Sequence, residues 1–477
     1  MLRRSAVARM SMNEEKAETE AVETVGYVGG SGSAGTGPLC RHNMRYGVLH
    51  GAGFHMATAF ADPYAVIPLF LAGFTESRAL VGLVVSLVGA VGVVPQLGMS
   101  RKLRRNPGSA KMFMLVAIWT RCGMWGLIAL IALLMSVQSV WILIVFMCLI
   151  SIYSLGGGIA VLPFKQVVTE TIAPDRRSTF FGRRLLIGGI LAVLAGAVVA
   201  QVLGSNALVW PRNYGILFGL SFVSLAVAYT AMSQLRFAHR SGTARDARLR
   251  PLHKEVASAF KEYPILKRLI AVRLLSGGLP LVFPFLTLYA TRELHISLAW
   301  VGVYVAARQA GGILSNLGWM PLGDRLGTRA VILAGLALAV VSFAAILVSK
   351  SAIALAVAFG LAGGGMSAMI VGFSGYILEL GTPELRPLLF ALEDTLLMPL
   401  YFMPLLGGFL VDGYGYRPTL LVGGSLLVAA FVCACALCEP RRGDAACGPC
   451  SPSPQGNPAA SATPKSGGEH VNEEHCQ

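Results

Sequence analysis

Three ionisable side chains, Asp62, Arg121 and Arg308, lie deep inside long apolar stretches of this sequence. A charge in apolar surroundings is costly, so such residues normally face a protein interior or a water-filled cavity, where they bind ions or substrates. Pro63 interrupts helical hydrogen bonding directly after Asp62, and His55 lies two turns earlier on the same helical face. Asp62 therefore has two interpretations: a proton-binding pair with His55, or an acid that only caps the break in the helix.

The two arginines allow two kinds of chemistry. Either Arg121 or Arg308 can pair with Asp62, or it can present its guanidinium to an anionic substrate. A buried ion pair without substrate contact is the alternative for both. Gln309 and Asn316 follow Arg308 in the same apolar stretch, and a polar stripe of this kind normally faces a bundle interior. Gln309 and Asn316 are therefore further candidates for substrate or coupling contacts.

The composition requires a membrane around these residues. Of the 477 residues, 55% are hydrophobic and 13% are charged, whereas soluble proteins are about one quarter charged. The apolar residues come in blocks of roughly 20, the length that crosses a bilayer as a helix. The sequence thus predicts an all-α integral membrane protein with twelve transmembrane helices. The predicted spans are 47–73, 78–99, 112–135, 139–162, 184–204, 213–235, 265–291, 297–318, 330–349, 352–380, 389–411 and 416–438.

The net charge of +15 is explained by membrane topology and not by nucleic-acid binding. Roughly four in five of the 39 Lys and Arg residues fall in the two tails and in the even-numbered connections between spans. Positively charged connections stay on the cytoplasmic side, so we expect both termini in the cytoplasm. We expect a monomer that crosses a lipid bilayer many times, in the cytoplasmic (inner) membrane of a bacterium.

Composition also divides the chain into five segments. Residues 1–45 and 441–477 are rich in small and polar residues and are expected to be disordered tails. Residues 46–235 and 265–440 hold six predicted spans each. The basic stretch 236–264 joins them as a cytoplasmic linker, and its sequence KEVASAFKEY predicts a short amphipathic helix on the inner leaflet.

An internal repeat relates the two groups of six spans. The connection after the fourth span contains Glu170 and Arg177, and the connection after the tenth contains Glu379 and Arg386 at the same spacing. The residues Pro174, Asp175 and Phe181 recur in register as Pro383, Glu384 and Phe390. Parallel repeats of six spans are a transporter architecture with its site at mid-membrane between the halves. The repeat therefore predicts two pseudo-symmetric six-helix bundles.

The connections also carry a family resemblance. The loop GDRLGTR at 323–329 resembles the signature loop of the major facilitator superfamily, although Met320 stands where that signature has a glycine. The E-x6-R pairs of the repeat resemble a second cytoplasmic motif of the superfamily, and PLLGG at 404–408 is similar to the end of bacterial members. The resemblance covers roughly residues 46–441. It implies a secondary transporter that works by alternating access of its two halves.

Charges at the cytoplasmic helix ends predict a gate. Asp324 ends the eighth span and Glu393 opens the eleventh, where the helix dipole favours an acid by roughly 0.3–1 kcal/mol. Ion pairs between such acids and neighbouring arginines must break when the cytoplasmic side opens, so they favour the outward-facing state. Anchoring of the helix ends is the alternative. The predicted gate residues are Asp324, Arg325, Gly327, Arg329, Glu170, Arg177, Glu379, Arg386, Glu393 and Asp394.

The sequence favours a proton-coupled secondary transporter of a small solute, because one buried acid and one histidine are enough to couple protons. The family resemblance favours export, and uptake of an organic anion or metabolite through Arg308 and Arg121 is the alternative. A receptor or scaffold on the same fold and a membrane-embedded enzyme are the remaining classes. The sequence has no P-loop, and the single C-x-x-C at 447–450 lacks a second pair of metal ligands. We therefore expect no enzymatic activity, no metal and no cofactor.

Overall fold

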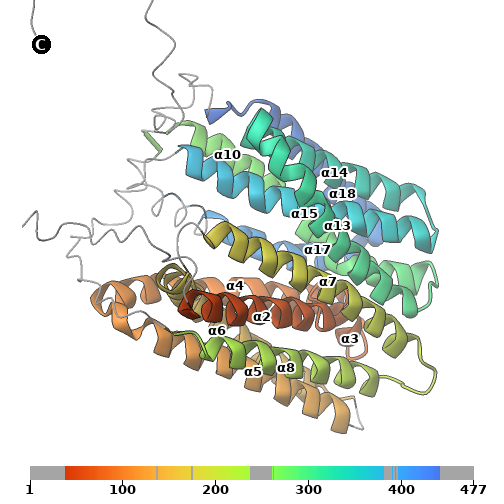
Figure 1. Ribbon diagram of the computed structural model, residues 1–477. Helices are drawn as coiled ribbons and strands as arrows, with labels where there is room; N and C mark the ends of the chain where they lie inside the picture. The colour runs from red at the N-terminus through yellow and green to blue at the C-terminus, as the bar shows by residue number, and fades with distance from the viewer. Residues whose placement is uncertain are drawn as a thin grey trace, which may run out of the picture.

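The computed structural model describes residues 38–135, 138–172, 176–236, 260–261, 263–380, 389, 393 and 396–440. Almost all of these residues lie in helices, and this part of the chain contains no strand. Figure 1 shows the helices as two bundles, with the first half of the chain in red to yellow-green and the second half in green to blue. The prediction of an all-α fold with two bundles is confirmed.

Seven helices form the first bundle. They are α2 (Pro38–Phe60), α3 (Val66–Leu71), α4 (Arg78–Arg105), α5 (Ala110–Leu134), α6 (Val140–Thr171), α7 (Arg177–Gly204) and α8 (Arg212–Ser233). Within the bundle α2 packs on α7 and α8, α5 packs on α6 and α8, and α4 packs on α6. Each predicted span of this half coincides with one helix, except that the first span consists of α2 and α3.

The second bundle is built from longer helices and several short pieces. They are α10 (Ile265–Leu275), α11 (Gly278–Val282), the 3-10 turn η3 (Phe283–Phe285), α12 (Leu286–Leu288), the π-helix η4 (Tyr289–Glu293), α13 (Ala299–Leu326), α14 (Thr328–Val348), α15 (Ala352–Leu380), the 3-10 turn η5 (Met398–Phe402), α17 (Met403–Tyr414) and α18 (Tyr416–Cys435). The seventh predicted span is thus broken into short segments. Gly277 lies between α10 and α11, Pro280 lies inside the short α11 and Pro284 lies in η3, as expected from residues that disfavour a continuous helix.

The described residues include nine helices that are long and apolar enough to cross a membrane, so the protein is a multi-pass membrane protein. The first, eighth and eleventh predicted spans are not among the nine. The first span is interrupted near Asp62, the eighth carries charges inside and at its end, and the eleventh lies partly outside the described residues. The number twelve therefore remains a prediction.

The boundary that composition placed at residue 45 needs correction, because α2 begins at Pro38. The reason is a specific contact that composition does not reveal. The side chain of Asn43 donates to the carbonyl of Arg236 at 2.9 Å and accepts from its N–H at 3.0 Å, and His42 contacts the carbonyl of Gln234 at 3.0 Å. These bonds hold the start of α2 against the end of α8, where the predicted linker begins.

Both ends of the described chain lie on one face of the molecule, which we call the tail face, and Figure 1 shows them at the left. The even-numbered connections meet there. Lys111 at the start of α5 donates to the carbonyl of Leu235 after α8 at 2.9 Å, and Arg329 at the start of α14 donates to the carbonyl of Cys435 at 2.7 Å. We call the opposite face the far face.

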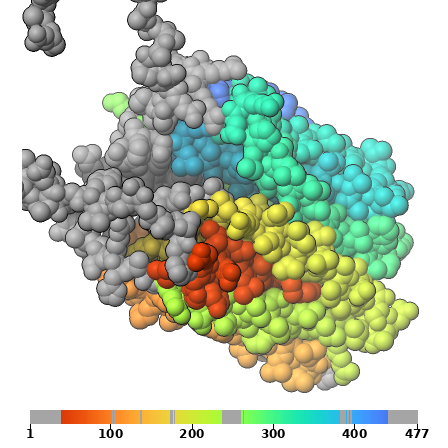
Figure 2. All heavy atoms as spheres, in the orientation of Figure 1, coloured from red at the N-terminus to blue at the C-terminus, as the bar shows by residue number. Residues whose placement is uncertain are grey.

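The two halves meet along α7 with α13 and along α4 with α17. Figure 2 shows the yellow helix α7 against the teal helix α13 along the seam between the halves. Two glycines make this close approach possible, because a Cβ at Gly302 of α13 would overlap Ala200, and a Cβ at Gly408 of α17 would overlap Ala79. These contacts lie in the parts of the helices next to the far face.

The side of the membrane on which each face lies can be tested directly. Cysteines placed at Leu208, in the connection after α7, and at Arg245, in the linker, are expected to react from opposite sides of the membrane. The distribution of Lys and Arg predicts Leu208 outside and Arg245 inside. Labelling with a membrane-impermeant maleimide in intact cells and in inverted vesicles measures this. Labelling of both positions from one side would contradict the predicted topology.

Candidate functional site

The first predicted span is interrupted at its acid. α2 ends at Phe60 and α3 begins at Val66, with Asp62 between them. The carbonyl of Asp62 accepts from the N–H groups of Val66 and Ile67 at 3.0 Å, and one carboxylate oxygen accepts from the N–H of Tyr64 at 2.9 Å. Asp62 is 0% exposed. Asp62 therefore holds the turn between α2 and α3: its carboxylate bonds to Tyr64 before the helix, and its backbone carbonyl bonds to the first residues of α3.

The second carboxylate oxygen of Asp62 forms an ion pair with the guanidinium of Arg308 on α13, in the opposite half of the protein. The side chain of Arg308 is 13% exposed, and its guanidinium lies 5.8 Å from the centre of the Tyr64 ring. Next to this pair, Thr287 of α12 donates to the carbonyl of Ala65 at 3.4 Å. The break in the first span is thus a further place where the first half contacts the second, and a buried ion pair joins them there.

Of the partners predicted for Asp62, the structure selects Arg308. His55 packs instead against Gly188 of α7, where a Cβ would overlap its imidazole ring. The guanidinium of Arg121 lies 4.3 Å from the centre of the Tyr153 ring and 5.7 Å from that of Phe54. The Asp62/His55 pair and the Asp62/Arg121 pair therefore do not describe this structure, because the chain bends away from the α2 helix before it reaches Asp62.

In the polar stripe predicted on the eighth span, Asn316 connects two helices. Asn316 donates to the carbonyl of Gly312 at 2.8 Å and accepts from the hydroxyl of Ser367 on α15 at 2.8 Å. Gln309 is half-buried on the same helix. The amide of Asn316 is therefore used to hold α13 against α15.

Sequence reasoning missed two residues in the first half, His50 and Arg184. His50 is 5% exposed, and its Nδ1 lies 2.9 Å from Nη1 of Arg184 on α7. The aliphatic part of Arg184 lies over Gly51, and its guanidinium lies 4.9 Å from the centre of the Phe164 ring. The hydropathy pattern placed Arg184 in a basic connection. Because α7 begins at Arg177, Arg184 lies about two turns inside the helix.

An acid on the far face was also missed. Asp412, near the end of α17, accepts from the hydroxyl of Ser77 at 3.0 Å and from the N–H groups of Arg78 and Ala79 at 2.8 and 2.9 Å. These groups form the N-terminus of α4 in the other half. The guanidinium of Arg78 donates to the hydroxyl of Tyr416, at the start of α18, at 3.3 Å. Asp412 thus caps a helix across the boundary between the halves.

A second contact between the halves lies on the same face. Arg292 of η4 is 3.6 Å from the carboxylate of Glu76 and donates to the carbonyl of Ala72 at 3.2 Å. We call this set of contacts, made by Asp412, Arg78, Tyr416, Arg292 and Glu76, the far-face lock. The lock joins the halves at the end where their helices already pack closely.

The signature loop lies on the tail face, between α13 and α14. Gly327 has φ +90° and ψ 171°, and the carboxylate of Glu439 packs directly on its Cα. Glu439 also accepts from the N–H of Arg329 at 3.2 Å, and Thr328 donates to the carboxylate of Glu379 at 2.8 Å. Glu379 of α15 and Glu439, which follows α18, therefore hold the start of α14. Glu439 was not among the predicted gate residues.

The other predicted gate residues are spread over the tail face. Asp324 and Arg325 are exposed at the end of α13. Glu170 accepts from the side chain of Gln166 one turn earlier at 2.8 Å, and Arg177 donates to two carbonyl oxygens at the end of α6. Arg177 thus bonds to the C-terminal end of α6, whereas Glu170 bonds to a residue of its own helix.

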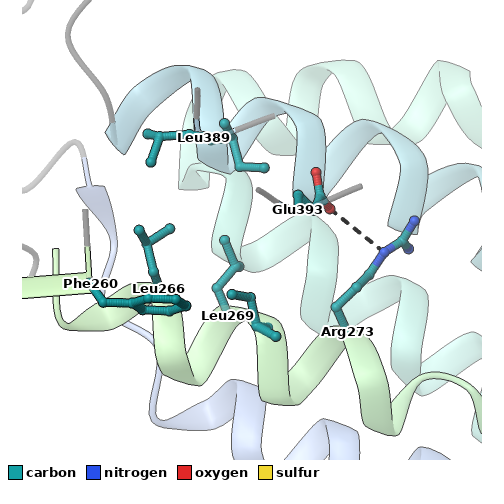
Figure 3. Close-up of a pocket in the computed structure, with 8 residues that line it drawn as sticks. Phe260, Leu266, Leu269, Arg273, Leu389 and Glu393 are labelled. Atoms are coloured by element: carbon teal, nitrogen blue, oxygen red, sulfur yellow. Dashed lines mark ion pairs between the residues drawn. The ribbon is translucent and has the colours of Figure 1, made fainter. Parts of the chain in front are cut away.

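Glu393 pairs with Arg273, which was not among the predicted gate residues. Figure 3 shows Arg273 of α10 and Glu393 pointing toward one another, with 3.8 Å between Nε and Oε1. The apolar side chains of Phe260, Leu266 and Leu389 line the other end of this narrow pocket. Glu393 therefore lies against the seventh span. Arg386 and Asp394 lie outside the described residues.

Comparison with known proteins agrees with this geometry. Residues 269–461 match the Major Facilitator Superfamily. No curated protein matches the chain.

Several solved structures have a similar fold at low sequence identity. A D-xylose–proton symporter has a TM-score of 0.65 and 13% identity, covering 84% of this chain and 99% of that chain. A bacterial homologue of the human lysosomal transporter Spinster, inward-facing and occupied, has a TM-score of 0.63 and 14% identity, covering 88% and 100%. The nucleoside transporter NupG has a TM-score of 0.60 and 14% identity, covering 84% and 99%.

The sequence match falls in the second half of the chain, and the similarity of fold extends over both halves. The signature loop, the paired bundles and the contacts between them are consistent with both findings. The second half of the chain thus matches the Major Facilitator Superfamily, and the fold of both halves is similar to that of solved membrane transporters.

Proposed function

We propose that the protein is a proton-coupled secondary transporter of a small solute and that Asp62 carries the coupled proton. The observation that supports this is the buried ion pair between Asp62 and Arg308. It joins the two halves at the break in the first span. In alternating access, contacts between the halves are made and broken as the halves move. The nucleoside transporter and the sugar–proton symporter with a similar fold are consistent with solute transport.

The charge state of Asp62 would control this contact. The ionised carboxylate attracts the guanidinium of Arg308 in surroundings that exclude water, and a proton on the carboxylate removes that attraction. The free energy of the contact between the two halves therefore differs between the proton-bound and the proton-free protein. A proton bound on one side of the membrane and released on the other would thereby bias the direction of transport.

We further propose that the tail face is cytoplasmic, in a bacterial inner membrane, and that the structure is the inward-facing form of a monomer. The support is the distribution of Lys and Arg together with the far-face lock, which closes the outer side. Export is the proposed direction. Uptake of an organic anion is the second candidate, because Arg121 lies against aromatic rings with its Nε unpartnered among the described residues.

Flux measurements in proteoliposomes test the function. The purified full chain is reconstituted, and benzoate, D-xylose and uridine are followed with and without an imposed pH gradient. Accumulation of one solute that depends on the gradient supports the proposal. Flux that is equal with and without the gradient would contradict proton coupling. A receptor or scaffold would give no flux above that of empty liposomes.

The far-face lock gives a separate prediction about the conformational equilibrium. Asp412→Asn leaves one oxygen where the carboxylate uses two, so part of the helix cap of α4 is lost. A cap contributes about 1 kcal/mol, so we expect the outward-facing form to gain population by about fivefold to tenfold. Spin labels at Asn206 and Ser297, on the far-face ends of the fifth and eighth spans, report the change as a longer distance. Glu293→Gln, an exposed acid on the same face, is the matched control, and equal distance distributions for both variants would show that Asp412 does not hold the lock.

A further inference from the structure

Two arginines and two histidines of the first half lie near one another without a carboxylate to balance them. Besides Asp62, the described residues of this half include the acids Glu76 and Glu170. Asp62 pairs with Arg308 in the other half, and the other two acids lie at the far face and the tail face. Within the described residues, the bundle interior around His50 and His55 therefore carries positive charge from Arg121 and Arg184 and no acid.

The basic groups are connected by aromatic rings. Arg184 contacts His50, whose ring centre lies 5.8–6.1 Å from those of Phe164, Tyr229 and Phe54. Arg121 lies over the Tyr153 ring and near Phe54. These contacts thus connect side chains of α7, α2, α5 and α6, in that order. Both arginines are half-buried.

The polar atoms of this cluster are not fully used by the protein. The Nε of Arg121 is buried and has no hydrogen-bond partner among the described residues. The polar partner that the structure gives to Arg184 is the imidazole of His50, which carries no negative charge. A desolvated guanidinium without a compensating anion is unfavourable, and Arg presents a fork of donors that matches a carboxylate.

A cavity of about 150 Å³ is lined in part by Phe54 and Tyr153, the two rings that the guanidinium of Arg121 contacts. Its lining includes Phe54, Trp125, Tyr153 and Leu225 from four different helices. Two hydroxyls of its lining already donate within the protein: Thr58 donates to the carbonyl of Phe54 at 2.9 Å, and Ser221 donates to that of Ala57 at 3.0 Å. An apolar cavity of this volume holds a group about the size of benzene.

We propose that this cluster binds a small organic anion, with its carboxylate at Arg121, with Arg184 adding to the positive charge that attracts it, and with its apolar body in the neighbouring cavity. The ligand class is a monocarboxylate with an aromatic or branched body of one ring size. Such a ligand would provide an acceptor for the unpartnered Nε of Arg121 and fill the cavity at once. This inference rests on the proposed transport function, since it names the class of solute, but it concerns a different site from the Asp62–Arg308 pair.

Equilibrium binding to the purified full chain in detergent tests the proposal without any transport. Benzoate is titrated by calorimetry and by the fluorescence of Trp125 and the other tryptophans, beside benzamide as its neutral counterpart and benzylamine as a cation. We expect benzoate to bind at least about tenfold more tightly than benzamide, and benzylamine not to bind. Equal affinity for the three probes, or preference for benzylamine, would overturn the proposal.

Variants locate the site. Arg121→Gln and Arg184→Gln are each expected to weaken benzoate binding by about tenfold or more, and Arg184→Lys is expected to retain part of it. Arg212→Gln removes an exposed arginine at the start of α8 and should leave the affinity unchanged. Benzoate affinity that is equal in all four folded variants would place the anion elsewhere. Because affinity is measured at equilibrium, benzoate binding without gradient-driven flux would contradict the proposed coupling and still support this site.

Discussion

Asp62→Asn is expected to abolish accumulation of solute against a gradient, while exchange of solute for solute across the membrane continues. Asparagine resembles the protonated acid but cannot release a proton, so the variant should cycle only when the site is loaded on both sides. We expect a loss of accumulation of at least about tenfold, measured in proteoliposomes with an imposed pH gradient and with the solute that the flux panel identifies.

Asp62→Asn also breaks the ion pair with Arg308, so a second variant is needed to separate loss of the proton from loss of the pair. Removing one partner leaves Arg308 without its acid, which costs about 3–5 kcal/mol when the pair is buried. The double variant Asp62→Asn/Arg308→Gln removes both charges, and it should recover folded protein that is still uncoupled. Glu293→Gln, an exposed acid, should accumulate solute normally. Normal accumulation by Asp62→Asn would place the coupled proton on another residue, and loss of exchange as well, in folded protein, would point to a structural role at the helix break.

Gly327→Ala is expected to produce the largest loss of stability among the glycines of the tail face. The backbone of Gly327 has φ +90° and ψ 171°, a conformation that costs other residues on the order of 1–3 kcal/mol. In addition, a Cβ at this position would overlap the carboxylate of Glu439, which is buried and which bonds to the N–H of Arg329. The midpoint of thermal unfolding in detergent, followed by tryptophan fluorescence, should fall by several degrees.

Two other glycines separate the contributions to this effect. Gly415 has φ +84° and ψ 177° with open space around it, so Gly415→Ala reports the backbone strain alone. Gly318 lies inside α13, also with open space, and Gly318→Ala should raise stability by about 0.5–1 kcal/mol, as alanine favours a helix. Gly327→Ala should therefore unfold at a lower temperature than Gly415→Ala. Equal midpoints for these two variants would mean that the contact with Glu439 contributes nothing.

Several features of the site could be predicted from the sequence alone. The depth of Asp62 and Arg308 in their apolar stretches identified both as costly charges, and pairing of the two was one of the interpretations left open. The proline after Asp62 predicted a break in the helix, and α2 does end at Phe60. These inferences depend on local properties: the length of an apolar run and the conformational limits of one residue type.

Other features required the three-dimensional structure, because they depend on which helices become neighbours. His55 shares a helical face with Asp62 in a continuous helix, but the chain breaks between them, and the ring packs on α7 instead. Asp412 caps α4, a helix more than 300 residues away in the chain, as its separations of 333 and 334 residues from Ala79 and Arg78 show. No spacing within the sequence encodes a contact of that kind.

The sequence by itself determined the class of protein, the parallel repeat and the residues whose charges need an explanation. Hydropathy is a property summed along the chain, so a bilayer-length apolar run is readable without a fold. The tertiary structure alone decided which charge meets which: Asp62 with Arg308, Arg273 with Glu393, and Arg184 with His50. The physical reason is that hydrogen bonds and close ion pairs form only between atoms within about 4 Å of one another. Partners are therefore set by the packing of helices that lie far apart in the chain.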